Sequence, residues 1–243
     1  HKFLEIAWAA QRSGLVFTPI STHLKKEETA YILENCGAKL FVGSLQLADV
    51  AEQLLAEATG VEHFYMVNGI KPGFNSWEEA ADAQPTAPID DQSYGVAMLY
   101  SSGTTGKPKG VFIPPHDTAF DAEPLIAPTL GSAFGFSGET VYLSPAPLYH
   151  AAPLHYNMMN QFMGGTSVIM EKFDPERALA LIEEHRATHS QWVPIMFIRM
   201  LKLPQDVRDR YDISSMQVAI HAAAPCPVEI KAQMIQWWGE VIV

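Results

Sequence analysis

The sequence is poor in cysteine and lacks long apolar runs. Its 243 residues include two cysteines, Cys36 and Cys226, which lie far apart and match no metal-ligand spacing, so reduced, buried thiols are expected. No apolar run reaches the ~18 residues that a membrane span needs, and the first residues have no signal-peptide pattern. These features predict a cytoplasmic protein with no transmembrane segment.

Positive charge is also scarce. The chain has 16 Lys and Arg against 27 Asp and Glu, a formal net charge of −11, and its basic residues are scattered. A nucleic-acid partner is therefore not expected. An acidic chain can still bind ATP, because a phosphate site needs only local backbone N–H groups and one or two cations. With 48% hydrophobic residues, the composition is that of a globular protein with a sizeable core.

Strand-like and helix-like segments alternate along the chain. We expect strands at 40–42, 63–67, 96–100, 111–113, 141–143, 168–170, 190–193 and 218–220, and helices at 2–12, 47–58, 154–163, 175–185 and 228–238, with one short helix near Trp77. This alternation predicts an α/β fold with largely parallel sheets flanked by helices. The polar stretch 71–93 is the candidate subdomain boundary.

The two ends predict a piece of a larger domain. The last residues, Val241 to Val243, have the pattern of a strand, and natural domains seldom end inside an apolar strand. The sequence also opens at His1, directly in a helix-like stretch.

The segment from Tyr100 to Val111 has the composition of a polyphosphate site. Its three glycines allow backbone N–H groups to face an anion, and its hydroxyls and two lysines can bind phosphate oxygens. A flexible hairpin turn has the same composition, so composition leaves both interpretations open. A Walker A loop is disfavoured, because Pro108 stands where Ser or Thr is needed.

The run from Ser102 to Gly110, SGTTGKPKG, resembles the signature of the adenylate-forming (AMP-binding) superfamily, which includes acyl-CoA synthetases, luciferases and nonribosomal adenylation domains. Residues 5–20, 147–150, 192–194 and 222–225 are similar to other family segments, in the same order. The resemblance therefore spans nearly the whole chain. It implies that residues 1–243 are a partial, incomplete N-terminal domain of fatty-acid–CoA ligase type, and that the C-terminal lid domain and the Tyr-Gly-x-Thr-Glu element are absent.

Members of this superfamily join a carboxylic acid to the AMP part of ATP and then pass the acyl group to a thiol, usually that of CoA. The resemblance implies ATP, Mg²⁺ and CoA as cofactors and co-substrates, and an acid with an apolar acyl chain or an aromatic ring. It also implies that the chain alone is inactive. Three alternatives stay open: an adenylation domain that feeds a carrier protein, a luciferase-like relative, and a nucleotide-binding module without catalysis.

The resemblance also implies roles for individual residues. Those expected at the phosphates are Ser101, Ser102, Gly103, Thr104, Thr105, Gly106, Lys107 and Lys109, and those expected at adenine are His221, Ala222, Ala223, Ala224 and Pro225. The acid would contact Tyr149, Met158, Trp192 and Pro194, with His150 as the catalytic candidate.

Structural roles remain as alternatives for several of these residues. Lys109 is equally suited to bracing the loop, His221 to capping a strand, and Met158 to filling a core. No metal ligand is expected, since a His150 and His155 pair lacks nearby carboxylates.

Overall fold

The computed structural model describes residues 2–58, 60–101, 107–114 and 131–243. The chain divides into two compact units, His1–Ala122 and Glu123–Val243, which we describe separately. Residues 71–93 lie inside the first unit, and the division between the units falls after them. Among the described residues, no helix has both the length and the apolar character that crossing a membrane requires.

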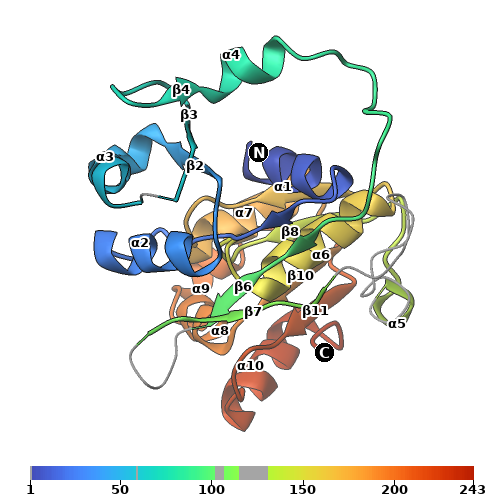
Figure 1. Cartoon of the computed structure of the whole chain (residues 1–243). Coiled ribbons are helices and arrows are strands. Elements are labelled where there is room, and N and C mark those ends of the chain that lie inside the picture. Colours follow the sequence, from blue (N-terminus) through green and yellow to red (C-terminus); the bar gives the residue numbers. More distant parts are fainter. Residues whose placement is uncertain (1, 59, 102–106, 115–130) are drawn as a thin grey trace. The chain divides into compact units, whose positions relative to one another are not determined.

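The first unit combines short helices with three small sheets (Figure 1). Its described elements are α1 (Lys2–Arg12), β1 (Val16–Phe17), α2 (Lys26–Asn35), β2 (Leu40–Ser44), η1 (Leu45–Leu47), α3 (Ala48–Glu57), β3 (His63–Val67), β4 (Asn75–Ser76), α4 (Trp77–Asp82), β5 (Val96–Ala97), β6 (Leu99–Ser101) and β7 (Lys109–Val111).

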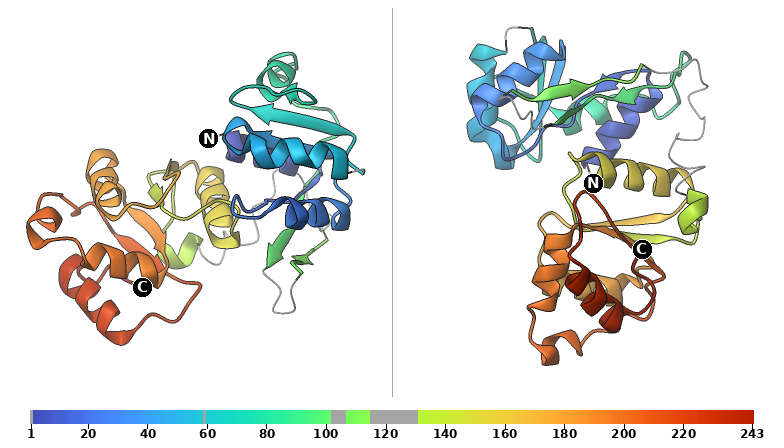
Figure 2. Two further views of the ribbon diagram at one scale, coloured as in Figure 1. Left: turned by 90° about the vertical axis from the view of Figure 1, so that its left-hand side faces the viewer. Right: turned by 90° about the horizontal axis from the view of Figure 1, so that it is seen from below.

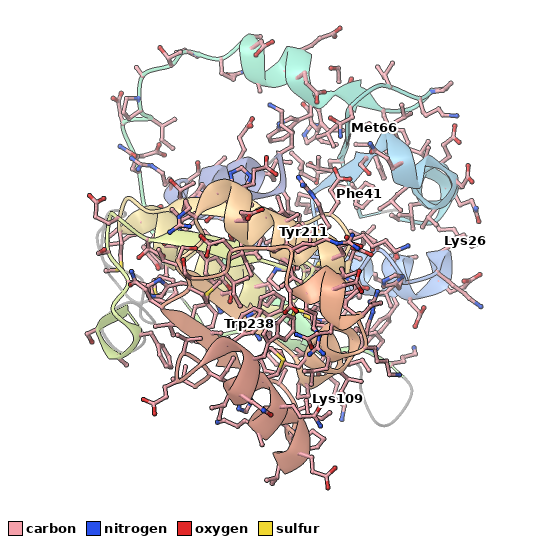
Figure 3. All side chains as sticks on the ribbon, turned by 180° about the vertical axis from the view of Figure 1, so that it is seen from behind. Lys26, Phe41, Met66, Lys109, Tyr211 and Trp238 are labelled. Atoms are coloured by element: carbon pink, nitrogen blue, oxygen red, sulfur yellow. The ribbon has the colours of Figure 1, made fainter. Side chains whose placement is uncertain are left out.

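Apolar side chains from α3 and the parallel β2–β3–β4 sheet form the core of this unit. The helical spacing of Ala48, Ala51 and Leu54 places all three on the buried face of α3. Phe41 and Met66, labelled in Figure 3, extend this core from β2 and β3. A second parallel pair joins β1 to β5, with Val16 opposite Val96.

A β-hairpin carries the segment that resembles the superfamily signature. Strands β6 and β7 are antiparallel, with Tyr100 opposite Gly110 and Ser101 opposite Lys109. The signature segment therefore connects two hydrogen-bonded strands, and its two ends are fixed by the strand register.

The second unit is built around one parallel four-stranded sheet in the order β11-β10-β8-β9 (Figures 1 and 2). Its described elements are α5 (Ser132–Phe134), β8 (Val141–Ser144), α6 (Ala151–Phe162), β9 (Thr166–Ile169), α7 (Pro175–His185), β10 (His189–Trp192), α8 (Pro194–Leu201), α9 (Gln205–Arg208), β11 (Val218–His221) and α10 (Val228–Trp238).

Both faces of this sheet are covered by helices. Successive strand residues point to opposite faces, so Leu143 packs with α7, α8 and α10 while its neighbour Tyr142 packs with α6. Ala219 and Ile220 of β11 divide between the two faces in the same way. Trp238 of α10, labelled in Figure 3, belongs to the first of these cores. The α/β class with largely parallel sheets is confirmed.

Several expected elements have the bounds that the sequence predicts. Helices α1, α7 and α10 and strand β3 match residue for residue. The final apolar residues, expected as a strand, form an isolated bridge beside β11: Ala219 donates its backbone N–H to the Val241 carbonyl at 2.7 Å and His221 donates to the Val243 carbonyl at 3.0 Å.

Other expectations need correction. The single strand expected at 96–100 is two strands, β5 and β6, which pair with different partners. The strand expected at 111–113 begins two residues earlier, because β7 pairs from Lys109 opposite Ser101. Helices α2, α5, α8 and α9 are not among the elements expected from the sequence.

Candidate active site

Most of the candidate residues in the second unit follow the carboxyl ends of three parallel strands. Strands β8, β10 and β11 end at Ser144, Trp192 and His221, and parallel strands place these ends at one edge of the sheet. The candidate segments 149–150, 192–194 and 221–225 lie at or just beyond these ends. In open parallel sheets, ligands bind at this edge.

His150 lies at the start of α6. It is the N-cap residue, in an extended conformation, and its backbone carbonyl accepts the N–H of Leu154 at 3.1 Å. Its side chain is exposed, and its ring centroid lies 4.5 Å from that of Tyr149. The amino end of a helix favours a nearby negative charge, so this position suits a carboxylate ligand.

The segment after β11 has a constrained backbone. Ala222 donates its N–H to the carbonyl of Trp192 at 3.0 Å, which ties the segment to the end of β10. The next residue, Ala223, has φ of 71°, a left-handed backbone conformation that residues other than glycine rarely adopt. Strained backbone of this kind clusters at ligand sites.

His221 presents a buried ring nitrogen. Its Nε2 is buried and has no hydrogen-bond partner among the residues that the structure describes. Its ring lies edge-on to Phe197, with centroids 6.3 Å apart. Burial, and then the nearby charge of Lys231, lower the pKa of His221, so the ring is neutral at pH 7.

The residues expected to contact the acid are mostly buried. The indole of Trp192 is fully buried, donates to Ser190 Oγ, and packs edge-on against Trp238. Pro194 is the first residue of α8 and Met158 lies on a buried turn of α6. Trp192 thus contributes its side chain to the core and its backbone to the edge of the sheet. The role of Tyr149, Met158, Trp192 and Pro194 in binding the acid stays a prediction.

In the first unit, the structure describes three of the candidate phosphate residues. Ser101 and Lys109 lie directly opposite each other across the hairpin, and Lys107 lies between them in the sequence. All three side chains are exposed. The other candidates, Ser102, Gly103, Thr104, Thr105 and Gly106, lie outside the described residues.

Gly110 provides the room that the hairpin needs. A Cβ at this position would lie 2.4 Å from Met98 Cε and 2.9 Å from Tyr100 Cζ. The ring of Tyr100 therefore lies against the backbone of its cross-strand partner, and any larger residue would displace it.

Helix α2 contacts the hairpin through two residues that sequence reasoning missed. Tyr100 donates its hydroxyl to Asn35 Oδ1 at 2.6 Å, and Lys107 Nζ lies 4.8 Å from the centre of the Tyr31 ring. The sequence carries a signal for this helix in Glu28, whose carboxylate accepts the backbone N–H of Lys25 three residues earlier. Nothing in the sequence links α2 to the hairpin.

Within the described parts of the chain, no three His, Cys, Asp or Glu residues cluster as metal ligands do. Mg²⁺ is commonly held by one or two carboxylates together with substrate phosphates. A Mg²⁺ site of that kind needs fewer protein ligands than such a cluster contains, so the involvement of Mg²⁺ stays a prediction.

A profile of the family described as AMP-binding enzyme matches residues 1–243. Among curated proteins, the crotonobetaine/carnitine–CoA ligase of Escherichia fergusonii is 29% identical over 208 residues, which are 81% of this chain and 39% of that protein. The 4-coumarate–CoA ligase 5 of Oryza sativa subsp. japonica is 34% identical over 158 residues, 63% of this chain and 28% of that protein. The chain thus spans less than half the length of these relatives.

Solved structures have the same fold. The anthranilate CoA ligase AuaEII in complex with anthranoyl-AMP is 25% identical, with a TM-score of 0.81 over 94% of this chain and 44% of that one. ATP-bound MatB from Rhodopseudomonas palustris is 24% identical, with a TM-score of 0.73 over 95% of this chain and 44% of that one.

Proposed function

The chain belongs to the AMP-binding enzyme family, and from that membership we propose that it is part of an ATP-dependent acid–thiol ligase. The whole enzyme would convert a carboxylic acid to an acyl-adenylate and then to a thioester with CoA. The observation that carries the proposal is the position of SGTTGKPKG, residues 102–110: it follows Ser101 at the end of β6 and runs into β7, where the exposed Lys109 lies opposite Ser101.

In the first step, a carboxylate oxygen attacks the α-phosphorus of ATP, and the bond from that phosphorus to the bridging oxygen of the β-phosphate breaks. Pyrophosphate leaves with the bonding electrons. Lys107 and Lys109 would offset the charge that develops on this leaving group, and backbone N–H groups of the hairpin would hold it in line.

In the second step, the thiolate of CoA attacks the acyl carbon, and AMP leaves with the electrons of the acyl–oxygen bond. His150 lies at the amino end of α6, where the helix dipole would favour the substrate carboxylate that reacts in the first step. The small side chains of Ala222, Ala223 and Ala224 would let adenine approach the backbone at the edge of the sheet.

An apolar or aromatic acid is the substrate class that we propose. The residues proposed to contact the acid, Met158 and Pro194, are apolar and buried, and Phe197 packs beside His221. The relatives named above act on acids of different kinds, since one is a crotonobetaine/carnitine ligase and another a 4-coumarate ligase. Fatty-acid metabolism and a cytoplasmic location stay predictions from the sequence.

We propose that this chain alone binds nucleotide without completing the reaction, because it spans 39% to 41% of the length of the related crotonobetaine/carnitine–CoA ligases. The test is acid-dependent exchange of labelled pyrophosphate into ATP, measured with a panel of fatty and aromatic acids. The complete enzyme should catalyse exchange with at least one acid, and this chain with none.

The same assay separates the alternatives. Exchange followed by transfer to CoA supports the proposed ligase, whereas transfer to a carrier protein alone supports an adenylation domain. ATP binding by the complete enzyme with no exchange for any acid would contradict the proposal and support a module without catalysis.

A further inference from the structure

The hairpin of the first unit is held from one side by a single turn of α2. Tyr31 and Asn35 are four residues apart, so they lie on the same face of this helix. We infer that Tyr31 and Asn35 are positioning residues, which hold Tyr100 and Lys107 of the hairpin so that Lys107 and Lys109 can bind the β- and γ-phosphates of MgATP. The inference rests on the proposed function. It adds helix α2, to which the proposed function assigns no catalytic or binding role.

The first anchor fixes the strand that enters the loop. The hydroxyl of Tyr100, the residue before Ser101, donates to Asn35 Oδ1 at 2.6 Å. Burial, with the nearby Cys36 and Tyr31, raises the pKa of the Tyr100 hydroxyl, so it keeps its proton and donates this hydrogen bond at neutral pH.

The second anchor restricts the side chain of Lys107, the residue after Gly106 in the sequence. The ammonium of Lys107 lies 4.8 Å from the centre of the Tyr31 ring, within the range of a cation–π interaction. A lysine side chain has many rotamers, and the contact with the Tyr31 ring restricts those of Lys107 in the absence of phosphate. Less conformational freedom then remains to be lost on binding.

The anchors are separate from the core of α2. The helix packs through Ile32 and Leu33, which are almost fully buried, whereas Asn35 is exposed and Tyr31 half-buried. Substitutions at Asn35 and Tyr31 should therefore leave the helix in place and change the hairpin.

The experiment is calorimetric titration of this chain with inorganic pyrophosphate and with MgATP, and with AMP as a ligand that lacks the β- and γ-phosphates. Asn35→Ala and Tyr100→Phe should each weaken pyrophosphate binding by about two- to tenfold, the range for loss of one hydrogen bond. The double variant should be no weaker than either single one, because both remove the same bond.

Tyr31 is tested by a matched pair of variants. Tyr31→Leu removes the ring and should weaken pyrophosphate binding about two- to fivefold, whereas Tyr31→Phe keeps the ring and should retain the wild-type affinity. AMP affinity and the urea midpoint should stay at wild-type values in all of these variants, since a general loss of structure would change both.

Unchanged pyrophosphate affinity in Asn35→Ala, Tyr100→Phe and Tyr31→Leu would overturn the inference. If Lys109→Met still weakened binding in that case, the proposed function would stand. If the wild-type chain bound neither pyrophosphate nor MgATP, the inference and the proposed phosphate site would both fail.

Discussion

The backbone N–H of Ala222 donates to the carbonyl of Trp192 at 3.0 Å, which joins the segment after β11 to the end of β10. These two segments were assigned different roles from the sequence, one at adenine and one at the acid. A hydrogen bond between them means that a shift of one backbone displaces the other. Under the proposed roles of these segments, binding of the nucleotide and binding of the acid would therefore be coupled.

The left-handed backbone of Ala223 predicts the effect of substitution there. At φ of 71° a Cβ costs energy, so Ala223→Gly should raise the free energy of unfolding by about 1 kcal/mol. Ala224→Gly is the control and should lower it by about 0.5 kcal/mol, because this residue has no such conformation and glycine adds freedom to the unfolded chain. Urea unfolding followed by tryptophan fluorescence gives both values. Equal destabilisation by the two variants would contradict the prediction.

The position of His150 predicts a loss of rate without a loss of nucleotide affinity. His150→Ala in the complete enzyme should slow adenylate formation about ten- to hundredfold, because the reacting carboxylate loses its alignment. The dissociation constant of MgATP should change less than about twofold. Single-turnover kinetics and calorimetry measure the two quantities, and His63→Gln, an exposed histidine of the first unit, is the control. A wild-type rate in His150→Ala would refute the assignment.

Lys109 is expected to bind phosphate directly. Lys109→Met should weaken MgATP binding by this chain about ten- to hundredfold, the range for a hydrogen bond to a charged group, and leave AMP binding unchanged. Lys39→Met removes another exposed lysine of the same unit and should have no effect on affinity. If Lys109 only braces the hairpin, Lys109→Met would lower stability, and its MgATP and AMP affinities would change together.

Asp212 predicts how stability falls in acid. Hydrogen bonds from the hydroxyl and backbone N–H of Ser214, and then from Arg186, lower its pKa from 3.8 to about 2. A carboxylate with a lowered pKa in the folded state stabilises the fold above its unfolded pKa, and this contribution is lost as the pH falls from about 4 to about 2.

The check is urea unfolding across this range of pH. Asp212→Asn should flatten the dependence of the unfolding free energy on pH between about 4 and 2, and Arg186→Gln should flatten it less, since the Ser214 hydrogen bonds remain. An identical pH profile in wild type and Asp212→Asn would contradict this account.

The elements that the sequence predicts best have strong local signals. Helix α7 begins at the expected residue because Asp174 accepts the N–H of Arg177 at 2.8 Å and Pro175 follows it. Strand β3 has an uninterrupted run of apolar and aromatic residues, and α10 ends before Gly239 with its expected positive φ. In each case the information lies within a few residues of the boundary.

The parts that the sequence could not predict depend on distant contacts. The hydrogen bond from Tyr100 to Asn35 joins residues 65 positions apart, and the sequence around each residue does not indicate its partner. The division of Val96 to Tyr100 between two sheets likewise depends on their partners, Val16 and Gly110. Trp192 shows the same limit, because only the packing of α10 reveals that its indole lies in the core.

The central claim is that the hairpin between Ser101 and Lys109 binds the pyrophosphate half of ATP. A crystal structure of the complete enzyme with a non-hydrolysable MgATP analogue tests it most directly. The account predicts the β- and γ-phosphate oxygens within hydrogen-bonding distance of the hairpin backbone and of Lys109 Nζ. Phosphates bound elsewhere, with no hairpin atom in contact, would contradict it.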